Sequence, residues 1–241
     1  MTEQGSSAPK RFYAKAFVEP AENGFAVLLD GRTARTRRGA PLGGASRRLV
    51  DAVAAEWEAQ GARIEPQTMP LTRLLSTSID LGEAESDKWR ARVAAFLKAD
   101  ALCYRADAPA ELAARQASVW DPYIDWAGEL FGGRLLVTTG VGFVAQPTEI
   151  LAKAQETLDS ASPDEALSLR ILAETTGSGV LALARWRGAF DADAIYAASR
   201  LDEAFQIEKW GEDAEAKARD ARVRADYDAA GRFLDLQSAS G

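Results

Sequence analysis

The sequence of 241 residues contains no histidine and only one cysteine. Without histidine, the chain lacks the commonest general base, the commonest metal ligand, and the Ser-His and Cys-His nucleophile pairs. A single cysteine permits neither an internal disulfide nor a zinc site built on cysteines. Because these absences remove most catalytic arrangements, we assign no catalytic residue, no metal site and no cofactor to the chain.

Long apolar runs are absent as well. No run approaches the roughly 18 to 20 residues that a membrane span needs, so we expect no membrane insertion. The chain has 36 acidic and 29 basic residues, and its net charge of −7 argues against general nucleic-acid binding.

The basic residues are nevertheless concentrated in one part of the chain. A solvated hairpin and helix start would explain this arginine cluster, and a docking patch for an acidic partner is the alternative. The cluster consists of Arg32, Arg35, Arg37, Arg38, Arg47 and Arg48.

Two short motifs could carry chemistry but have simpler explanations. Cys103 lies between Leu102 and Tyr104 in a strand-like run, so we expect a buried thiol and not a reactive nucleophile. Residues 177–179, Gly-Ser-Gly, resemble a phosphate-binding loop, yet the Lys-Ser/Thr of a Walker sequence is missing. We interpret them as a helix stop and expect no ATP hydrolysis.

The N-terminal part of the chain has the pattern of a small sheet. Residues 25–29 form a β-like run, and Asp30-Gly31 is a two-residue hairpin signal that returns the chain through residues 32–36. A helical pattern follows over residues 45–60.

Helical patterns dominate the remainder, and the whole predicts an α+β fold. We expect a disordered tail at residues 1–9, an N-terminal α+β domain at residues 10–80 and a mostly helical domain at residues 81–241. Residues 100–105 read as a strand, and residues 135–143 are β-like but interrupted by Gly140 and Gly142. Strands at residues 100–105 and 135–140 could join the N-terminal sheet, and residues 179–186 fit either strand or helix. The other predicted helices span residues 70–82, 86–98, 109–131, 163–177, 192–210 and 213–234, with one more starting at Pro147.

The segment 201–215 presents two helical faces of different character. In a helix running from residue 192, Leu201 and Phe205 fall on a core-facing stripe. Isoleucine and tryptophan are unusual on a solvated surface, so the opposite face is either buried by the rest of the chain or kept for a partner. That face carries Glu203, Gln206, Ile207 and Trp210.

Short motifs between residues 10 and 236 resemble those of a known family, and their order makes the resemblance specific. The motifs are Lys10-Arg11-Phe12-Tyr13, Leu29-Asp30-Gly31-Arg32, Pro41-Leu42, Glu56-Trp57-Glu58-Ala59-Gln60, Met69-Pro70-Leu71-Thr72-Arg73, Ile79-Asp80, residues 100–105, Trp120-Asp121-Pro122, Asp125-Trp126 and residues 201–215. With them the chain resembles the assembly chaperones for the α subunit of the F-type ATP synthase catalytic sector.

The resemblance implies a chaperone and not an enzyme. Such a protein would bind the unassembled α subunit, prevent its aggregation and hand it over to the β subunit. An unassembled subunit exposes an apolar interface that aggregates when its partner is missing. Mitochondrial members of the family would need a presequence, and the first eleven residues here are polar, so we expect a bacterial cytoplasmic protein.

Six residues are candidates for client binding. In the family the region around Glu203 is associated with function, and an aromatic anchor beside a charge matches the composition of interface cores. Trp57 is a second candidate, with core packing as the alternative. Glu212 lies at the next helix start, where an acid also suits the helix dipole. The full set is Trp57, Glu203, Gln206, Ile207, Trp210 and Glu212.

Two other classes of protein remain as alternatives. One is a small-molecule enzyme that uses carboxylates and arginines, which would require a pocket with convergent polar groups and shifted pKa values. The other is a structural subunit of a stable complex, which would have a large, permanently covered face. The net charge of −7 and the lack of long apolar runs favour a transiently bound protein over such a subunit.

Overall fold

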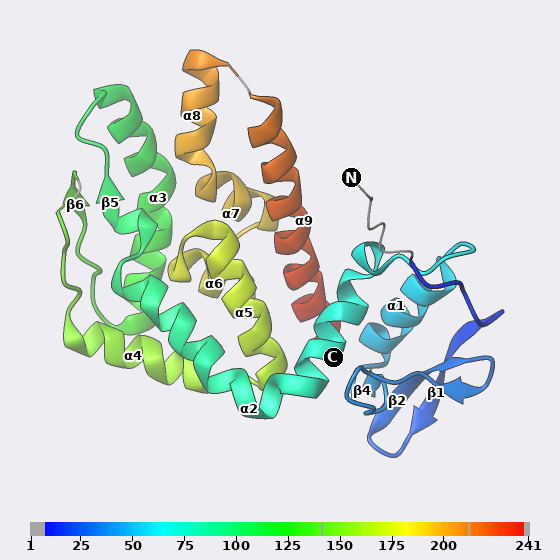
Figure 1. Cartoon of the computed structure of the whole chain (residues 1–241). Coiled ribbons are helices and arrows are strands. Elements are labelled where there is room, and N and C mark those ends of the chain that lie inside the picture. The colour runs from blue at the N-terminus through cyan, green and yellow to red at the C-terminus, as the bar shows by residue number, and fades with distance from the viewer. Residues whose placement is uncertain (1–7, 141, 212, 239–241) are drawn as a thin grey trace, which may run out of the picture. The chain divides into compact units, whose positions relative to one another are not determined.

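A computed structural model of the chain has the α+β architecture that the sequence predicts (Figure 1). It describes residues 8–140, 142–211 and 213–238. These form two compact units: the N-terminal unit, up to Glu83 and completed by the chain from Arg232 on, and the helical unit, from Ala84 to Gly231. Helices α2 (Pro70–Lys98) and α9 (Ala214–Gln237) contribute residues to both units.

The predicted tail includes residues 1–7, which lie outside the described residues, and the described residues Ala8 and Pro9. Arg63 Nη1 donates a hydrogen bond to the carbonyl of Ala8 over 2.6 Å, and the backbone N–H of Ile64 donates to the carbonyl of Pro9 over 2.8 Å. Ala8 and Pro9 are therefore attached to the N-terminal unit.

The N-terminal unit is built on an antiparallel sheet. Its central strand, β2 (Gly24–Leu29), pairs with β1 (Ala16–Ala21), β3 (Arg32–Thr33) and β4 (Gly43–Gly44). Asp30 and Gly31 join β2 to β3 with positive φ angles of 49° and 82°, as a tight two-residue hairpin turn requires. The predicted hairpin is thus confirmed.

Helix α1 (Arg47–Glu58) packs on this sheet. It buries Leu49, Val50 and Val53 almost completely, because their spacing places them on one side of the helix. Ser46, the residue that caps the helix, donates a hydrogen bond from Oγ to the carbonyl of Leu236 over 2.5 Å and so attaches the end of α9 to this unit. A 3-10 turn, η1 (Pro66–Thr68), then leads to α2.

α2 is one continuous helix, whereas the sequence predicted two helices separated near Gly82. A glycine inside a helix costs about 1 kcal/mol relative to alanine, which packing of its neighbours can offset. Leu74 and Leu75 before the glycine are buried, and so are Val93 and Leu97 after it. The predicted break was wrong because the burial of apolar side chains on both sides of Gly82 outweighs the low helix propensity of glycine.

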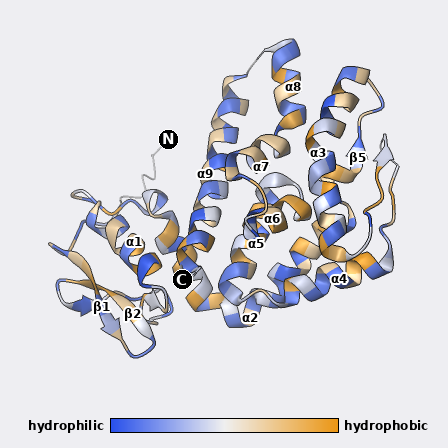
Figure 2. Ribbon diagram, turned by 180° about the vertical axis from the view of Figure 1, so that it is seen from behind, coloured by the Kyte–Doolittle hydropathy of each residue, from blue (hydrophilic) through white to orange (hydrophobic). Residues whose placement is uncertain are grey.

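The centre of the helical unit is α6 (Gly179–Trp186). Every side chain from Val180 to Ala184 is fully buried, and Figure 2 shows the helix coloured mainly as hydrophobic. A helix that is apolar on every side must be surrounded by other elements, which explains why residues 179–186 are helical and not a strand. The surrounding helices are α3 (Ala110–Phe131), α5 (Pro163–Thr176) and α7 (Ala192–Ser199), and α4 (Thr148–Asp159) packs on α3.

The Gly-Ser-Gly segment joins α5 to α6. Gly177 ends α5 with a φ of 70°, and Ser178 caps α6 by accepting the N–H of Leu181 over 3.0 Å. A Cβ atom on Gly179 would lie 2.6 Å from Leu97 Cγ, so only glycine lets α6 approach α2 this closely. The predicted helix stop is confirmed.

The two segments predicted as strands are mostly irregular. Residues 100–105 form a 3-10 turn, η2 (Ala101–Cys103), followed by the short strand β5 (Tyr104–Arg105). Of the described residues between 135 and 143, β6 (Thr138–Thr139) is the strand, and it pairs with β5 in parallel. Both belong to the helical unit and not to the N-terminal sheet, because each finds its partner in the other.

The predicted helix over residues 192–210 is two helices, α7 and α8 (Leu201–Trp210), which meet at Arg200. Ser199 Oγ donates to the carbonyl of Tyr196 over 2.7 Å, and such local side-chain bonds compete with the helical hydrogen-bond pattern. The predicted core stripe continues across this break, since Leu201 and Phe205 are buried.

Asp100 ties the start of α6 to the turn that follows α2. Its fully buried carboxylate accepts hydrogen bonds from Ser178 Oγ over 2.7 Å, the N–H of Val180 over 3.0 Å and the N–H of Leu102 over 3.1 Å. Burial raises the pKa of this carboxyl from its ordinary value of 3.8 to about 6, although the hydrogen bonds act in the opposite direction.

This raised pKa predicts a pH dependence of stability. Between about pH 4 and about pH 6, the folded chain holds a proton on Asp100 that the unfolded chain releases. The resulting stabilisation is complete below the pKa of the unfolded chain, about 4, and is lost as the pH rises through the pKa of the folded chain, about 6. In urea titrations, the free energy of unfolding of the unsubstituted chain minus that of Asp100→Asn should therefore fall between about pH 4 and about pH 7. A flat difference would show that the carboxyl titrates normally in the fold.

Candidate functional site

Helix α8 lies beside α3 and is attached to it by buried and polar contacts (Figure 1). Leu201 and Phe205 face inward and are buried. Three side-chain hydrogen bonds then link the helices along their length, which determines the side of α8 that faces outward. They join Gln116 Nε2 to Asp202 Oδ1 over 2.8 Å, Arg115 Nη1 to Glu208 Oε1 over 2.7 Å and Lys209 Nζ to Glu111 Oε2 over 2.9 Å.

The outward side carries the four residues that the sequence placed together. Glu203, Gln206, Ile207 and Trp210, which we call the α8 face, are all exposed. Ile207 is 42% exposed and Trp210 is 79% exposed, so the chain itself does not cover this apolar surface. The sequence left two alternatives for this face, burial by the rest of the chain or exposure for a partner, and burial is therefore wrong. Glu212, the neighbouring candidate, lies outside the described residues.

A polar cleft of about 500 Å³ adjoins the α8 face, and Glu203 and Gln206 contribute to its wall. Arg200 lines it too: its guanidinium donates to the carbonyl of Thr175 and lies 3.4 Å from Glu203 Oε1. Sequence reasoning did not identify Arg200, because its main partner belongs to the end of another helix and no local pattern connects the two.

The three acids of this cleft all have partners within the chain. Asp202 accepts a hydrogen bond from Gln116, and Glu203 pairs with Arg200. Glu174, near the end of α5, pairs through Oε2 with Arg170 of the same helix over 2.6 Å. The cleft therefore offers polar contacts next to the exposed Ile207 and Trp210, with carboxylates that are already engaged.

Trp57, the remaining candidate, lies on α1 in the N-terminal unit and is half-buried. The acids on either side of it have structural roles. Glu56 accepts the N–H groups of Leu71 and Thr72 at the start of α2, over 2.8 and 2.7 Å, and Glu58 accepts a backbone N–H of β1 over 2.7 Å. The buried indole Nε1 of Trp57, in contrast, has no hydrogen-bond partner among the described residues.

The surroundings of Trp57 show core packing, and its role as a partner contact stays a prediction. Its ring packs edge-on against Tyr13, with 5.7 Å between ring centroids, as a core residue would. It also lines two cavities of about 600 and 620 Å³. Trp57 belongs to the N-terminal unit, and the α8 face belongs to the helical unit.

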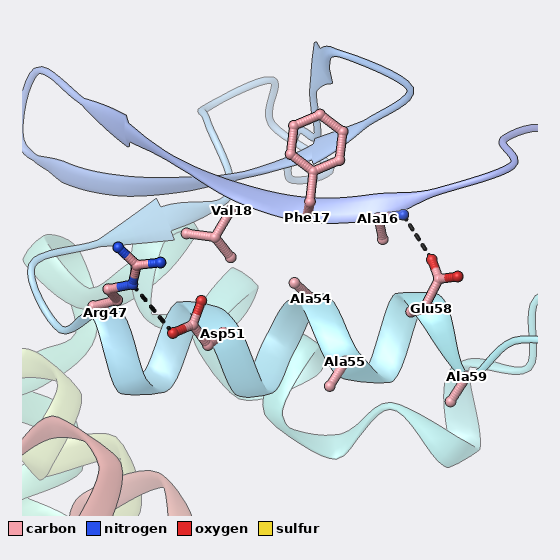
Figure 3. Close-up of a pocket in the computed structure, with 9 residues that line it drawn as sticks. All are labelled: Ala16, Phe17, Val18, Arg47, Asp51, Ala54, Ala55, Glu58 and Ala59. Carbon is pink, nitrogen blue, oxygen red and sulfur yellow. Dashed lines mark hydrogen bonds and ion pairs between the residues drawn. The ribbon is translucent and has the colours of Figure 1, made fainter.

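A further groove of about 680 Å³ lies between β1 and α1 (Figure 3). Val18 on the strand points toward the small alanines of the helix, whereas the ring of Phe17 points to the other side of the strand. An ion pair of 3.4 Å between Arg47 and Asp51 lines the groove, as does Glu58, which binds the N–H of Ala16. The groove offers apolar surface and engaged charges, and the sequence carried no signal for it beyond the alanines of α1.

Cys103 is fully buried, as the sequence predicts, and burial raises the pKa of its thiol to about 12. The thiol is therefore protonated at neutral pH and is a poor nucleophile.

Across the described ranges, no group of three or more His, Cys, Asp or Glu side chains could hold a metal ion. Helices that are both long and apolar enough to cross a membrane are likewise not found in those ranges.

Comparisons with known proteins agree with the resemblance found in the sequence. The family model described as ATP12 chaperone protein matches residues 10–128. Atp12 from Paracoccus denitrificans is 39% identical over 95% of this chain and 99% of its own, with a TM-score of 0.91. An aspartate-to-lysine mutant of Atp12p from the same organism is 38% identical over 95% and 98% of the two chains, also with a TM-score of 0.91. The Atu1473 protein of Agrobacterium tumefaciens is 38% identical over 95% and 87%, with a TM-score of 0.91.

Proposed function

Because the chain belongs to the ATP12 chaperone family, whose role is ATP synthase assembly, we propose that its client is the unassembled α subunit of the F-type catalytic sector. It holds this subunit, prevents its aggregation and hands it over to the β subunit. The reason for such a protein is physical: an interface meant for permanent burial is apolar, and it aggregates while its partner is missing.

The α8 face is the observation that carries this proposal. Trp210 and Ile207 expose apolar surface on a helix that α3 holds in place, and an exposed tryptophan is the kind of residue that dominates binding energy at interfaces. Glu203 and Gln206 supply polar contacts at its border, as interface rims do. Trp57 is proposed as a second contact, and Glu212 is proposed from its sequence position alone.

Handing the client over requires that it be bound transiently. A few anchors can hold a client without reaching the affinity of the permanent α–β contact, so the β subunit can displace the chaperone. The charges that flank the face are already paired between α8 and α3, so they contribute to orientation more than to affinity.

We further propose that the chain is not an enzyme. The acids of the cleft beside α8 have internal partners, and the buried Cys103 thiol is protonated at neutral pH. The alternative, an enzyme that uses carboxylates and arginines, would place its substrate in that cleft beside Arg200 and Glu203.

Aggregation assays on the isolated subunits test this function. The unassembled α and β subunits are each diluted from denaturant with and without the chain, and light scattering is recorded. The chain should suppress scattering of the α subunit at near-stoichiometric amounts and leave that of the β subunit little changed. Equal protection of both subunits, or of neither, would contradict the proposed client.

Reversing the charge of Glu203 tests the site. Glu203→Lys should weaken co-purification of the α subunit several-fold without loss of folding, because Glu203 is exposed and its ion pair with Arg200 is a surface pair. Glu156→Lys on α4 is the matched control, since Glu156 also forms an exposed pair, with Lys153 three residues away. Equal capture by both variants would remove Glu203 from the site.

A further inference from the structure

The two cavities at Trp57 have walls rich in arginine. They share Trp57 and Arg35, and every residue that lines them belongs to the N-terminal unit. We call the combined surface the arginine cleft. Its guanidinium groups are those of Arg32, Arg35, Arg37, Arg38 and Arg73.

The arginine cluster noted in the sequence thus divides in two. Arg47 lies elsewhere, over the ring of Phe25 at 5.5 Å from its centroid, and pairs with Asp51. The arginines at residues 32–38 instead converge with Arg73 of α2, from which they are well separated in sequence. Four of the five arginines are thus near neighbours in the sequence, and the fold adds Arg73 to them.

The carboxylates that line the cleft, Asp30 and Asp80, are already engaged. Asp30 accepts the backbone N–H groups of Ala14 and Lys15, and these bonds lower the pKa of its carboxyl. Asp80 accepts the hydroxyl of Thr36 over 2.5 Å and a backbone N–H of the hairpin over 3.3 Å. Arg35 and Arg38 donate to the carbonyls of Gly39 and Asp80, which leaves their positive charge in place. The four guanidinium groups of residues 32–38 against two carboxylates give a positive surface on a chain whose net charge is −7, and such a surface suits an anionic partner.

The cleft also has apolar parts and an unused donor. Phe12, 71% exposed, lines one cavity, and Ile64 and Met69 line the other. The indole N–H of Trp57, which lines both, has no acceptor among the described residues. Because this nitrogen is shielded by the fold, a ligand would contact the arginines and the apolar parts of the cleft.

We propose that the arginine cleft binds an extended acidic peptide segment of a partner protein. Acidic side chains of the segment pair with arginines of the cleft, and an apolar side chain rests against Ile64 and Met69. Aliphatic walls and the chain's acidic character favour a peptide over a nucleic acid. The proposal goes beyond the function of the α8 face: it gives the cleft around Trp57, in the other unit, the chemical class of the segment that it binds.

Fluorescence anisotropy with a designed probe tests the cleft without any ATP synthase subunit. The probe is a short fluorescein-labelled peptide of alternating Glu and Leu, and its counterpart carries Gln at every Glu. The unsubstituted chain should bind the Glu peptide, lose affinity as salt is added, and bind the Gln peptide about tenfold more weakly. Equal binding of the two peptides would overturn the proposal.

Variants then locate the binding site. Arg35→Glu/Arg37→Glu should weaken binding of the Glu peptide about tenfold, because two attractive charges become repulsive. Arg219→Glu/Arg222→Glu on α9 changes the net charge equally at exposed positions of the helical unit and should bind like the unsubstituted chain. Equal losses in both variants, or competition by an oligouridylate that binds more tightly than the peptide, would refute an acidic-peptide site in this cleft.

Discussion

Replacing Asp100 with alanine should lower the free energy of unfolding by about 3 kcal/mol, one of the largest effects of any single substitution in this chain. Asp100 is fully buried, and its carboxylate satisfies donors on Ser178, Val180 and Leu102. Alanine would leave these donors buried without partners at the start of α6, the helix around which the helical unit packs. Urea denaturation followed by circular dichroism at neutral pH measures the change.

Two controls separate this loss from general effects of the substitution. Asp107→Ala removes an exposed aspartate a few residues further on and should change the free energy of unfolding by less than about 0.5 kcal/mol. Ser178→Ala removes one donor together with the cap of α6 and should cost about 1 kcal/mol. An Asp100→Ala chain as stable as Asp107→Ala would show that the hydrogen-bonded carboxylate does not hold α6.

Loss of Trp210 should have the largest effect on client binding. We expect Trp210→Ala to weaken binding of the unassembled α subunit by about 2 kcal/mol, roughly 30-fold, since an exposed aromatic anchor at the centre of an interface carries much of its affinity. The free energy of unfolding should hardly change, because 79% of Trp210 is exposed and little of it packs in the fold. Titration of immobilised α subunit with the two chains measures the difference.

Phe143→Ala is the matched control for this prediction. Phe143 is an aromatic residue of the same unit with 74% exposure, and it lies outside the α8 face. Removing it should leave α-subunit binding unchanged. If both substitutions weaken binding equally, the affinity comes from general surface hydrophobicity and not from the α8 face.

Features that depend on close neighbours in the chain were predictable from the sequence. The Asp30-Gly31 hairpin and the helix stop at Gly177 are both present in the structure. Each depends on backbone preferences within about one turn, so a few residues specify it. The two faces of α8 were likewise predictable, because helical periodicity places residues on a side without reference to the rest of the fold.

Features that depend on distant packing were not predictable. The helix break expected at Gly82 does not occur, because buried residues on both sides hold α2 together. The sequence predicted neither the break at Arg200 nor the hydrogen bond from Arg200 to Thr175, because no local sequence pattern indicates either of them. Residues 100–105 looked like a strand, but most of them form a turn that places Asp100 under α6.

By itself, the sequence determined the fold class, the family and the side of α8 that carries Glu203 and Trp210, because composition, motif order and helical period are properties of the chain alone. The tertiary structure decided that this side is exposed, that Asp100 is buried, and that arginines from a hairpin and from α2 surround Trp57. Exposure and charge concentration depend on which distant residues meet, and only folding brings those residues together.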